Sequence, residues 1–224
     1  MASGTTIAVQ APRRNYSEEL ANGVTHGIGT VFAVGALAVL ATYATLLGNA
    51  WHIVTCSVFG ATLIFAYAAS TLYHTIQAPQ LKRLLRFVDH TAIFLLIAGT
   101  YTPFMLVNLR GPWGWTIFGI VWSMAIVGIV IHATTLHRFE VVSLILYIAM
   151  GWTAVIAAKP IIDSIPTGGL ILVFGGGLAY TGGVIFFLYE RLPYNHAIWH
   201  LFVLAGSAAH FFAILFYVIP LAGN

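Results

Sequence analysis

Charge is what this sequence has least of. Asp, Glu, Lys and Arg together make up 7% of its 224 residues, whereas apolar residues make up 60%. A soluble domain carries about a quarter charged residues, so this chain has too few charges to cover a surface that faces water. The composition therefore excludes an ordinary soluble protein and indicates an integral membrane protein.

Cysteine is nearly absent too, and several other signals are missing. The single thiol, Cys56, lies within an apolar run, so the chain forms no internal disulfide and redox chemistry is disfavoured. The first residues lack the apolar core and the cleavage site of a secretory signal peptide. No internal repeat is evident, which gives no support to a transporter built from inverted halves. The net charge of +3 is explained by orientation in the bilayer, not by binding to nucleic acid.

Long apolar runs are what the sequence does have. A spanning helix needs about 20 apolar residues, and seven runs of about this length predict an all-α protein with seven transmembrane helices. Breakers or charged residues separate them. We expect residues 1–18 to form a polar N-terminal tail and residues 19–224 a single seven-helix domain. The runs cover 27–47, 53–73, 90–108, 113–132, 141–158, 170–189 and 197–219.

The distribution of Lys and Arg predicts the orientation of these helices. If the N-terminus is cytoplasmic, only Arg110 and Lys159 fall in outer segments. Cytoplasmic segments of membrane proteins are enriched in positive charge, so we expect a multi-pass protein of the cell membrane with its C-terminus outside. The residues that would lie inside are Arg13, Arg14, Lys82, Arg83, Arg86, Arg138 and Arg191.

Ionisable residues within the apolar runs gather at one depth. His74 ends the second run, Asp89 precedes the third, and His196 precedes the seventh, so all three should lie at the cytoplasmic face. His196 and His200 are four residues apart and share one face of a helix. That pair alone is equally well explained as a structural polar pair at the membrane surface. The convergence of His74 and Asp89 favours a functional site.

Three neutral imidazoles with one open position are the usual architecture of a catalytic zinc site. In this interpretation His74, His196 and His200 bind zinc. Asp89 positions or deprotonates the water that the zinc makes more acidic, and Ser70 hydrogen-bonds the site or a reacting oxyanion. Because the site would open onto the inner leaflet, we expect hydrolysis of an amide or ester bond in a membrane lipid.

The remaining histidines are expected to play supporting roles. His26 should cap a helix or support the site, within a polar group that also contains Glu19 and Asn22. His90 should point away from Asp89, toward lipid headgroups or a loop. His210 lies about 15 Å deeper along its helix than His200, so it should form a buried hydrogen bond between helices. Loop or interfacial roles are expected for His52, His132 and His137.

At these residues the sequence resembles the hemolysin III proteins, bacterial relatives of the progestin and adipoQ (adiponectin) receptors. The resemblance runs from about Glu19 to the end of the seventh span. The matching stretches are Glu19-x-x-Asn22-x-x-Thr25-His26, Ser70-x-x-x-His74, Asp89-x-x-x-Ile93 followed by Gly99-Thr100-Tyr101-Thr102-Pro103, and His196-x-x-x-His200 with His210 beyond.

The resemblance implies a seven-helix fold with a cytoplasmic N-terminus and a zinc ion held by His74, His196 and His200. Asp89 would lie near the water on that zinc. The alkaline ceramidases are similar in their serine, aspartate and histidine motifs, which implies hydrolysis of a lipid amide. The bacterial members carry a cytolysin name and are linked to membrane homeostasis. The long N-terminal domain of the eukaryotic receptors has no counterpart here, so binding of a protein hormone is not implied.

Two other functions remain open from the sequence. The protein could be a receptor or sensor in which zinc is structural and membrane lipid is only a ligand. It could also be a pore-forming cytolysin. A conducting path needs polar groups through the full membrane thickness, and only scattered residues such as His210 lie deep in the spans. This makes the pore the weaker alternative.

Overall fold

The computed structural model describes residues 15–135 and 140–220, and these ranges are helical, with no strand among them. Seven helical segments of these ranges are long and apolar enough to cross a membrane, which confirms the predicted all-α integral membrane fold. The predictions for Arg13, Arg14, His137 and Arg138 fall outside the described residues. The elements are α1 (Tyr16–Leu47), α2 (Ala50–Thr75), α3 (Pro79–Pro103), η1 (Phe104–Asn108), α4 (Pro112–Thr135), α5 (Glu140–Gly151), η2 (Thr153–Ala157), α6 (Ala158–Ser164), α7 (Thr167–Leu188) and α8 (Asn195–Tyr217).

Two helices begin earlier than the apolar runs do. α1 starts at Tyr16, inside the segment expected to be a tail, and α3 starts at Pro79 rather than near residue 90. Proline suits the first turn of a helix, where its missing N–H would have no partner. Acidic Glu18 and Glu19 in the first turn of α1 favour the helix because they face its positive dipole end. These polar first turns bring charged residues to the functional site.

Irregular segments interrupt two of the spans. Pro103 lacks a backbone N–H and its ring crowds the carbonyl of Gly99, which weakens the last turn of α3, and the π-helical η1 follows it. The fifth span is divided into α5, the 3₁₀ segment η2 and α6, with Pro160 in the first turn of α6. Each break therefore lies near a proline.

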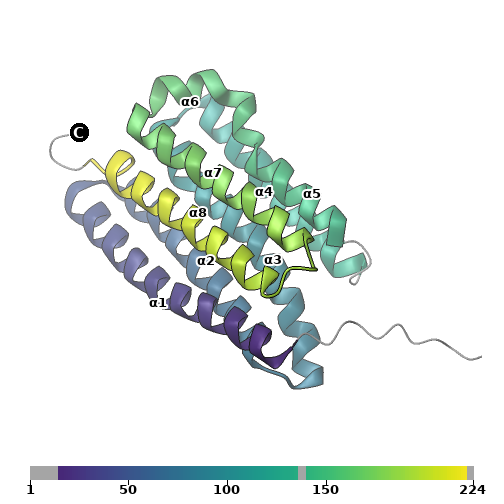
Figure 1. Cartoon of the computed structure of the whole chain (residues 1–224). Coiled ribbons are helices and arrows are strands. Elements are labelled where there is room, and N and C mark those ends of the chain that lie inside the picture. The colour runs from purple at the N-terminus through teal and green to yellow at the C-terminus, as the bar shows by residue number, and fades with distance from the viewer. Residues whose placement is uncertain (1–14, 136–139, 221–224) are drawn as a thin grey trace, which may run out of the picture.

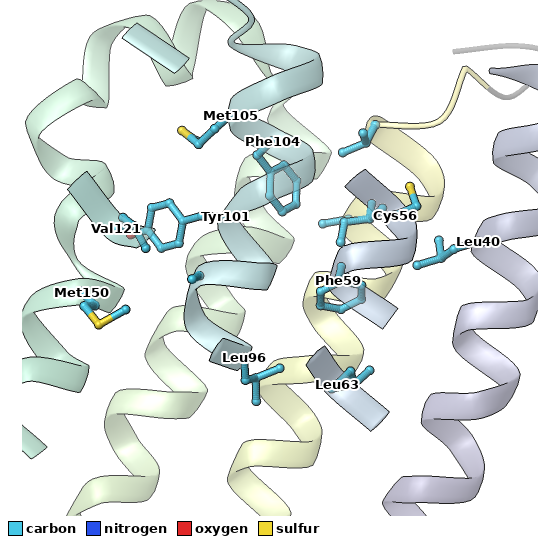
Figure 2. Packing of buried hydrophobic residues seen from close by; sticks show 14 of the residues in the cluster. Leu40, Cys56, Phe59, Leu63, Leu96, Tyr101, Phe104, Met105, Val121 and Met150 are labelled. Atoms are coloured by element: carbon cyan, nitrogen blue, oxygen red, sulfur yellow. The ribbon is translucent and has the colours of Figure 1, made fainter. Parts of the chain in front are cut away.

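The bundle is built around α3. With η1 it is the most buried span, and it packs against α2, α4 and α5, while α8 lies between α1 and α7 (Figure 1). A cluster of buried side chains from α1 to α5 fills the middle of the bundle, including Leu40, Phe59 and Met150 (Figure 2). Lipid chains are as apolar as these side chains, so close packing rather than exclusion of water holds the helices together.

Glycines let α7 and α8 approach each other closely. A Cβ on Gly176 would lie 2.5 Å from Cε1 of His210, and one on Gly183 would lie 2.7 Å from Cβ of Phe202. On the facing helix, a Cβ on Gly206 would lie 2.7 Å from the ring of Tyr180. Small residues of this kind are typical of membrane helix interfaces.

Candidate metal centre

Three histidines meet at the end of the bundle where α1, α3 and α8 begin, which we call the site end. His74 comes from the last turn of α2, and His196 and His200 come from the first two turns of α8. One ring nitrogen of each lies within 4.8 Å of those of the other two, and all three side chains are buried. The structure thus brings together the three residues proposed as metal ligands. Their role as ligands stays a prediction.

The turn between α7 and α8 determines where the first histidine of α8 lies. Tyr194 adopts a left-handed backbone with φ of 58°, which costs a non-glycine residue about 1 kcal/mol or more. Its backbone N–H donates to Oε1 of Glu18 at 3.2 Å. Next to it, Nδ2 of Asn195 donates to the carbonyls of Phe186 and Phe187 at 3.2 and 3.3 Å. These bonds tie the start of α8 to the start of α1 and the end of α7.

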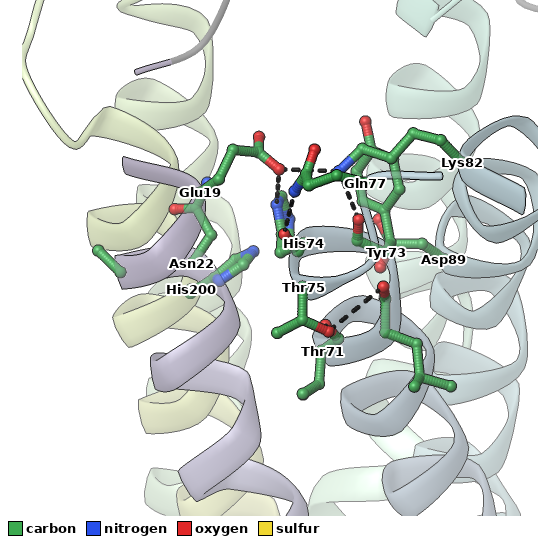
Figure 3. A network of polar contacts seen from close by, with 12 residues as sticks. Glu19, Asn22, Thr71, Tyr73, His74, Thr75, Gln77, Lys82, Asp89 and His200 are labelled. Atoms are coloured by element: carbon green, nitrogen blue, oxygen red, sulfur yellow. Dashed lines mark hydrogen bonds and ion pairs between the residues drawn. The ribbon is translucent and has the colours of Figure 1, made fainter. Parts of the chain in front are cut away.

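Glu19 orients the imidazole of His74. Its Oε2 lies 3.3 Å from Nδ1 of His74 and 2.9 Å from Nζ of Lys82, and Figure 3 shows the carboxylate between the two. Lys82 also donates to the carbonyl of Tyr73. Since a carboxylate only accepts hydrogen bonds, Nδ1 of His74 carries the proton and the lone pair is on Nε2. A carboxylate behind a histidine is the arrangement that commonly fixes a zinc ligand.

Thr25 fixes the ring of His200 in the same way. Its Oγ1 donates to the carbonyl of Ala21 or Asn22, at 3.0 and 2.9 Å, and lies 3.1 Å from Nδ1 of His200. A hydroxyl has one proton, so when Thr25 donates to a carbonyl, Nδ1 of His200 donates to Thr25 and the lone pair is on Nε2. Within the described ranges this buried Nε2 has no hydrogen-bond partner.

The donor set fits a divalent transition metal. Neutral imidazoles suit zinc, and three of them leave one coordination position for water or substrate. In the orientations of His74 and His200 described above, each ring carries its lone pair on Nε2. A bound metal ion would give a partner to Nε2 of His200, which has none among the described residues. The geometry thus supports a metal centre and does not identify the metal.

Ser70 and Asp89 lie beside the three histidines but not among the potential ligand atoms. Ser70 is one turn before His74 on α2 and only 2% exposed, and its Oγ has no hydrogen-bond partner in the described part of the chain. Asp89 lies on α3 and lines the same cavity as Ser70. Their catalytic roles stay predictions.

His26 stacks directly on a metal-centre histidine. Its ring centroid lies 3.5 Å from that of His200, with 11° between the planes, and the side chain is buried. It is outside the group of atoms that could share a metal. The expectation that His26 supports the site agrees with this stacking. Asn22, one turn away on α1, is also buried, and its amide has no partner among the described residues.

The expectation for His90 was wrong. Its Nδ1 lies 2.9 Å from the carbonyl of Arg86 and 3.7 Å from Oδ2 of Asp89, and its ring stacks on His132 with centroids 5.4 Å apart. The side chain turns back along its own helix, so its neighbour in sequence stays within reach. His132 is buried rather than in a loop, and its Nδ1 lies 3.5 Å from Oγ of Ser143.

Two other histidines also differ in detail from the expectations. Nδ1 of His210 donates to the carbonyl of Gly206 at 2.7 Å, so its hydrogen bond is within α8 rather than between helices. Its contact with α7 is ring stacking on Tyr180, with centroids 5.4 Å apart. His52 caps α2, since its Nδ1 accepts from the backbone N–H of Asn49 at 3.2 Å.

A cavity of about 560 Å³ begins beside the metal centre and extends through much of the bundle. Its wall includes His26, Ser70 and Asp89 at the site end and Ile165 and Leu170 at the far end. Most of the remaining lining is aliphatic or aromatic. A cavity of this size and character suits a largely apolar ligand.

One side of the cavity reaches the lipid-facing surface. Val155, Ile162 and Phe174 line the cavity and are 61%, 60% and 57% exposed. In the described residues α7 packs closely against α8 but not against α5 or α6. A hydrogen bond of 3.1 Å from Nε1 of Trp152 to Oγ1 of Thr181 bridges this side.

Sequence reasoning missed several residues of the site. Glu19 was expected at the depth of the histidines, but its bond to His74 was not predicted, and Lys82 was considered above only for its effect on orientation. Tyr67 and Tyr180, which line the cavity, were not singled out. Glu19 could have been identified as a site residue, because its carboxylate was expected at the same membrane depth as the histidines. No such signal marks a tyrosine in an apolar run.

Comparisons with known proteins identify the family of the chain. The family model described as "Haemolysin-III related" matches residues 14–211. Hemolysin-3 of Bacillus cereus is 48% identical over 205 residues, which cover 92% of this chain and 94% of that protein. The Hemolysin-3 homolog of Bacillus subtilis is 46% identical over 202 residues, covering 90% and 95%. The human monocyte to macrophage differentiation factor is 31% identical over 209 residues, covering 90% and 84%. The chain therefore belongs to the haemolysin-III related family.

Proposed function

We propose that this protein is a zinc-dependent hydrolase that cleaves an amide or ester bond of a membrane lipid. One observation carries the proposal. Three buried imidazoles that fit a metal lie next to an apolar cavity, whose wall includes Ser70, Asp89 and His26, the ring that stacks on His200. A hydrolytic site for a lipid needs this combination of a metal centre, a carboxylate and space for acyl chains.

The residues of the site have separable chemical roles. A bound zinc ion would polarise the lipid carbonyl and make a water molecule more acidic. Asp89 would accept the proton of the attacking water. Ser70, whose hydroxyl has no partner among the described residues, would donate to the oxygen on which charge develops. Glu19 and Thr25 would hold the ligand rings in one orientation.

The cavity supplies the substrate side of the proposal. Its apolar wall would accept the acyl chains, and its open side between α6 and α7 would admit a lipid directly from the bilayer. A substrate that enters sideways need not leave the membrane, so its apolar chains are never exposed to water.

We further propose that the metal centre faces the cytoplasm. Lys82 lies within the centre, whereas Arg110 lies over the ring of Trp51 near the opposite end of the bundle. Cytoplasmic segments carry the excess of Lys and Arg. The protein would then act on inner-leaflet lipid of the cell membrane and contribute to membrane homeostasis.

Lipid turnover by the purified protein tests the proposal. The protein in lipid nanodiscs is incubated with ceramides and phospholipids, and released fatty acid is measured by mass spectrometry. We expect product that disappears with a zinc chelator and returns when zinc is added. Asp89→Ala should reduce the rate by at least about 100-fold, the usual contribution of a general base.

Asp163→Ala is the matched control, since Asp163 is an exposed carboxylate paired with Lys159 by a bond of 2.8 Å. This variant should keep full activity. Bound zinc without turnover of any tested lipid would instead indicate a receptor or sensor with structural zinc. The name of the human relative, a differentiation factor, is compatible with that role.

A pore-forming function is suggested by the name of the Bacillus cereus relative, Hemolysin-3. The cavity argues against it, because most of its wall is apolar and ions need polar groups along their whole path. Leakage of a dye from liposomes that contain the protein would support the pore, and liposomes that stay sealed would exclude it.

A further inference from the structure

A second group of polar side chains extends deeper into the bundle than the metal centre. Tyr67 on α2, Tyr180 on α7 and His210 on α8 line the cavity, and the hydroxyl of Ser207 on α8 contacts those of both tyrosines. We call these four residues the deep polar cluster. His210 is ten residues beyond His200, which is about 15 Å along the helix axis. Tyr67, Ser207 and His210 are all buried. The cluster therefore lies in the apolar part of the bundle, where each polar group needs a partner.

The hydroxyl groups of the cluster leave one proton without an acceptor. Tyr67 donates to Oγ of Ser207 at 2.6 Å, and Oγ of Ser207 lies 2.8 Å from the hydroxyl of Tyr180. Three hydroxyls carry three protons, and these two contacts use two of them. The third proton belongs to Tyr180 or Ser207, and no described residue accepts it. The cluster thus offers a hydrogen-bond donor.

His210 offers the matching acceptor. Its Nδ1 donates to the carbonyl of Gly206 at 2.7 Å, so in the neutral ring Nε2 carries the lone pair. The ring is held between Tyr180, on which it stacks, and Gly176, where a Cβ would lie 2.5 Å from Cε1. His210 is 6% exposed and lines the cavity, and within the described ranges nothing donates to its Nε2.

We propose that the deep polar cluster binds a hydroxyl group on the chain of a lipid whose head lies at the metal centre. A hydroxyl both donates and accepts, so it matches a donor and an acceptor that lie side by side. An unsubstituted chain would leave both groups buried without partners, and sites of that kind discriminate against ligands that lack the polar group. This inference rests on the proposed function, because it requires a lipid in the cavity.

The test compares octadecanoic acid with a series of its mid-chain hydroxylated isomers. Binding to the full-length zinc-loaded protein is measured by displacement of a fluorescent fatty acid. We expect one isomer in the series to bind about fivefold more tightly than octadecanoic acid, the effect of one neutral hydrogen bond. This comparison uses only the wild-type protein, so it does not depend on the folding of any variant.

Variants then test whether the tighter binding of the hydroxylated isomer depends on the deep polar cluster. His210→Phe, which removes the acceptor, should bring the affinities for the preferred hydroxylated isomer and for octadecanoic acid to within about twofold of each other. Tyr101→Phe is the control in the same cavity. The hydroxyl of Tyr101 already donates to the carbonyl of Gly151 and accepts from the N–H of Ala154, at 2.7 and 3.0 Å. Its removal should leave the preference unchanged.

The outcomes separate this inference from the proposed function. Equal affinity for octadecanoic acid and every hydroxylated isomer would overturn the hydroxyl subsite and leave the lipid cavity intact. No binding of any of these acids would overturn the lipid cavity and the subsite with it. A preference that Tyr101→Phe also abolishes would show that the deep polar cluster is not its source, and would contradict the inference.

Discussion

At the scale of single residues, the carboxylate of Glu19 connects three helices. It accepts from Nδ1 of His74 on α2 and from Nζ of Lys82 on α3, at 3.3 and 2.9 Å. A carboxylate in this position makes the imidazole a better ligand and holds its ring in place. Glu19 should therefore have a large effect on the affinity for the metal, although it is outside the group of potential ligands.

Glu19→Gln should weaken zinc binding about 10- to 100-fold, the usual effect of removing a partner behind a zinc ligand. Competition with a chelator of known affinity measures the change. Glu18→Gln is the control, because Glu18 is the adjacent carboxylate and contacts the backbone N–H of Tyr194 instead. Equal zinc affinities for the two variants would show that Glu19 does not support the metal.

Membrane depth accounts for the part of the site that could be predicted. His74, Asp89 and His196 adjoin the ends of separate apolar runs, so the count of spans places them at one face. Depth says nothing about which side of a helix faces a neighbour. The pairing of Glu19 with His74 and the position of Tyr180 depend on helix rotation, which interhelical packing sets.

At the scale of helices, the interface between α7 and α8 makes a testable contrast between adjacent glycines. Gly176 packs on His210, whereas a Cβ on Gly175 would meet nothing within 4 Å. Gly176→Ala should lower the free energy of unfolding by about 1–3 kcal/mol, because it overpacks the interface. Gly175→Ala should raise it by up to about 1 kcal/mol, the difference in helix propensity.

Reaction of Cys56 with a thiol dye during heating reports the unfolding of these variants, because this single cysteine is buried. The two substitutions should shift the transition in opposite directions. A Gly176→Ala transition at or above that of the wild type would mean that the two helices are not in close contact there.

The number of helices was predictable because the bilayer requires each span to have about 20 apolar residues. The residues at which the helices begin and end were harder to predict. α1 and α3 continue into polar residues such as Glu18 and Lys82, since a helix keeps its backbone hydrogen bonds where hydropathy falls. The π-helical turn after Pro103 depends on how the freed carbonyls find partners, which the sequence pattern leaves open.

At the scale of the whole molecule, orientation decides which leaflet the metal centre can serve. Lys159, 86% exposed, and Glu190 in the α7–α8 turn lie at opposite ends of the bundle. In intact cells, Lys159→Cys should react with a membrane-impermeant maleimide, and Glu190→Cys should react only after lysis. Cys56 is 0% exposed and should give no background. The reverse pattern would place the site outside the cell.

The whole bundle also explains how a polar centre can exist within a membrane. The imidazoles are buried at the site end, and a largely apolar cavity, lined in part by the His26 ring that stacks on His200, extends through the bundle. Hydrolysis of a lipid needs both parts, since the head must reach the metal while the chains stay out of water. Each of the proposed roles of Asp89, Ser70 and the cavity depends on a metal ion at the three histidines.

Metal content is therefore the most direct test. Elemental analysis of the purified protein should find about one zinc per chain, the stoichiometry of a single three-histidine site. His196→Ala should lose most of this zinc. His52→Ala, which alters a histidine that caps α2 at the far end of the bundle, should retain it. Equal zinc in His196→Ala and the wild type, or a wild-type protein that binds no zinc when it is supplied, would contradict the proposed centre.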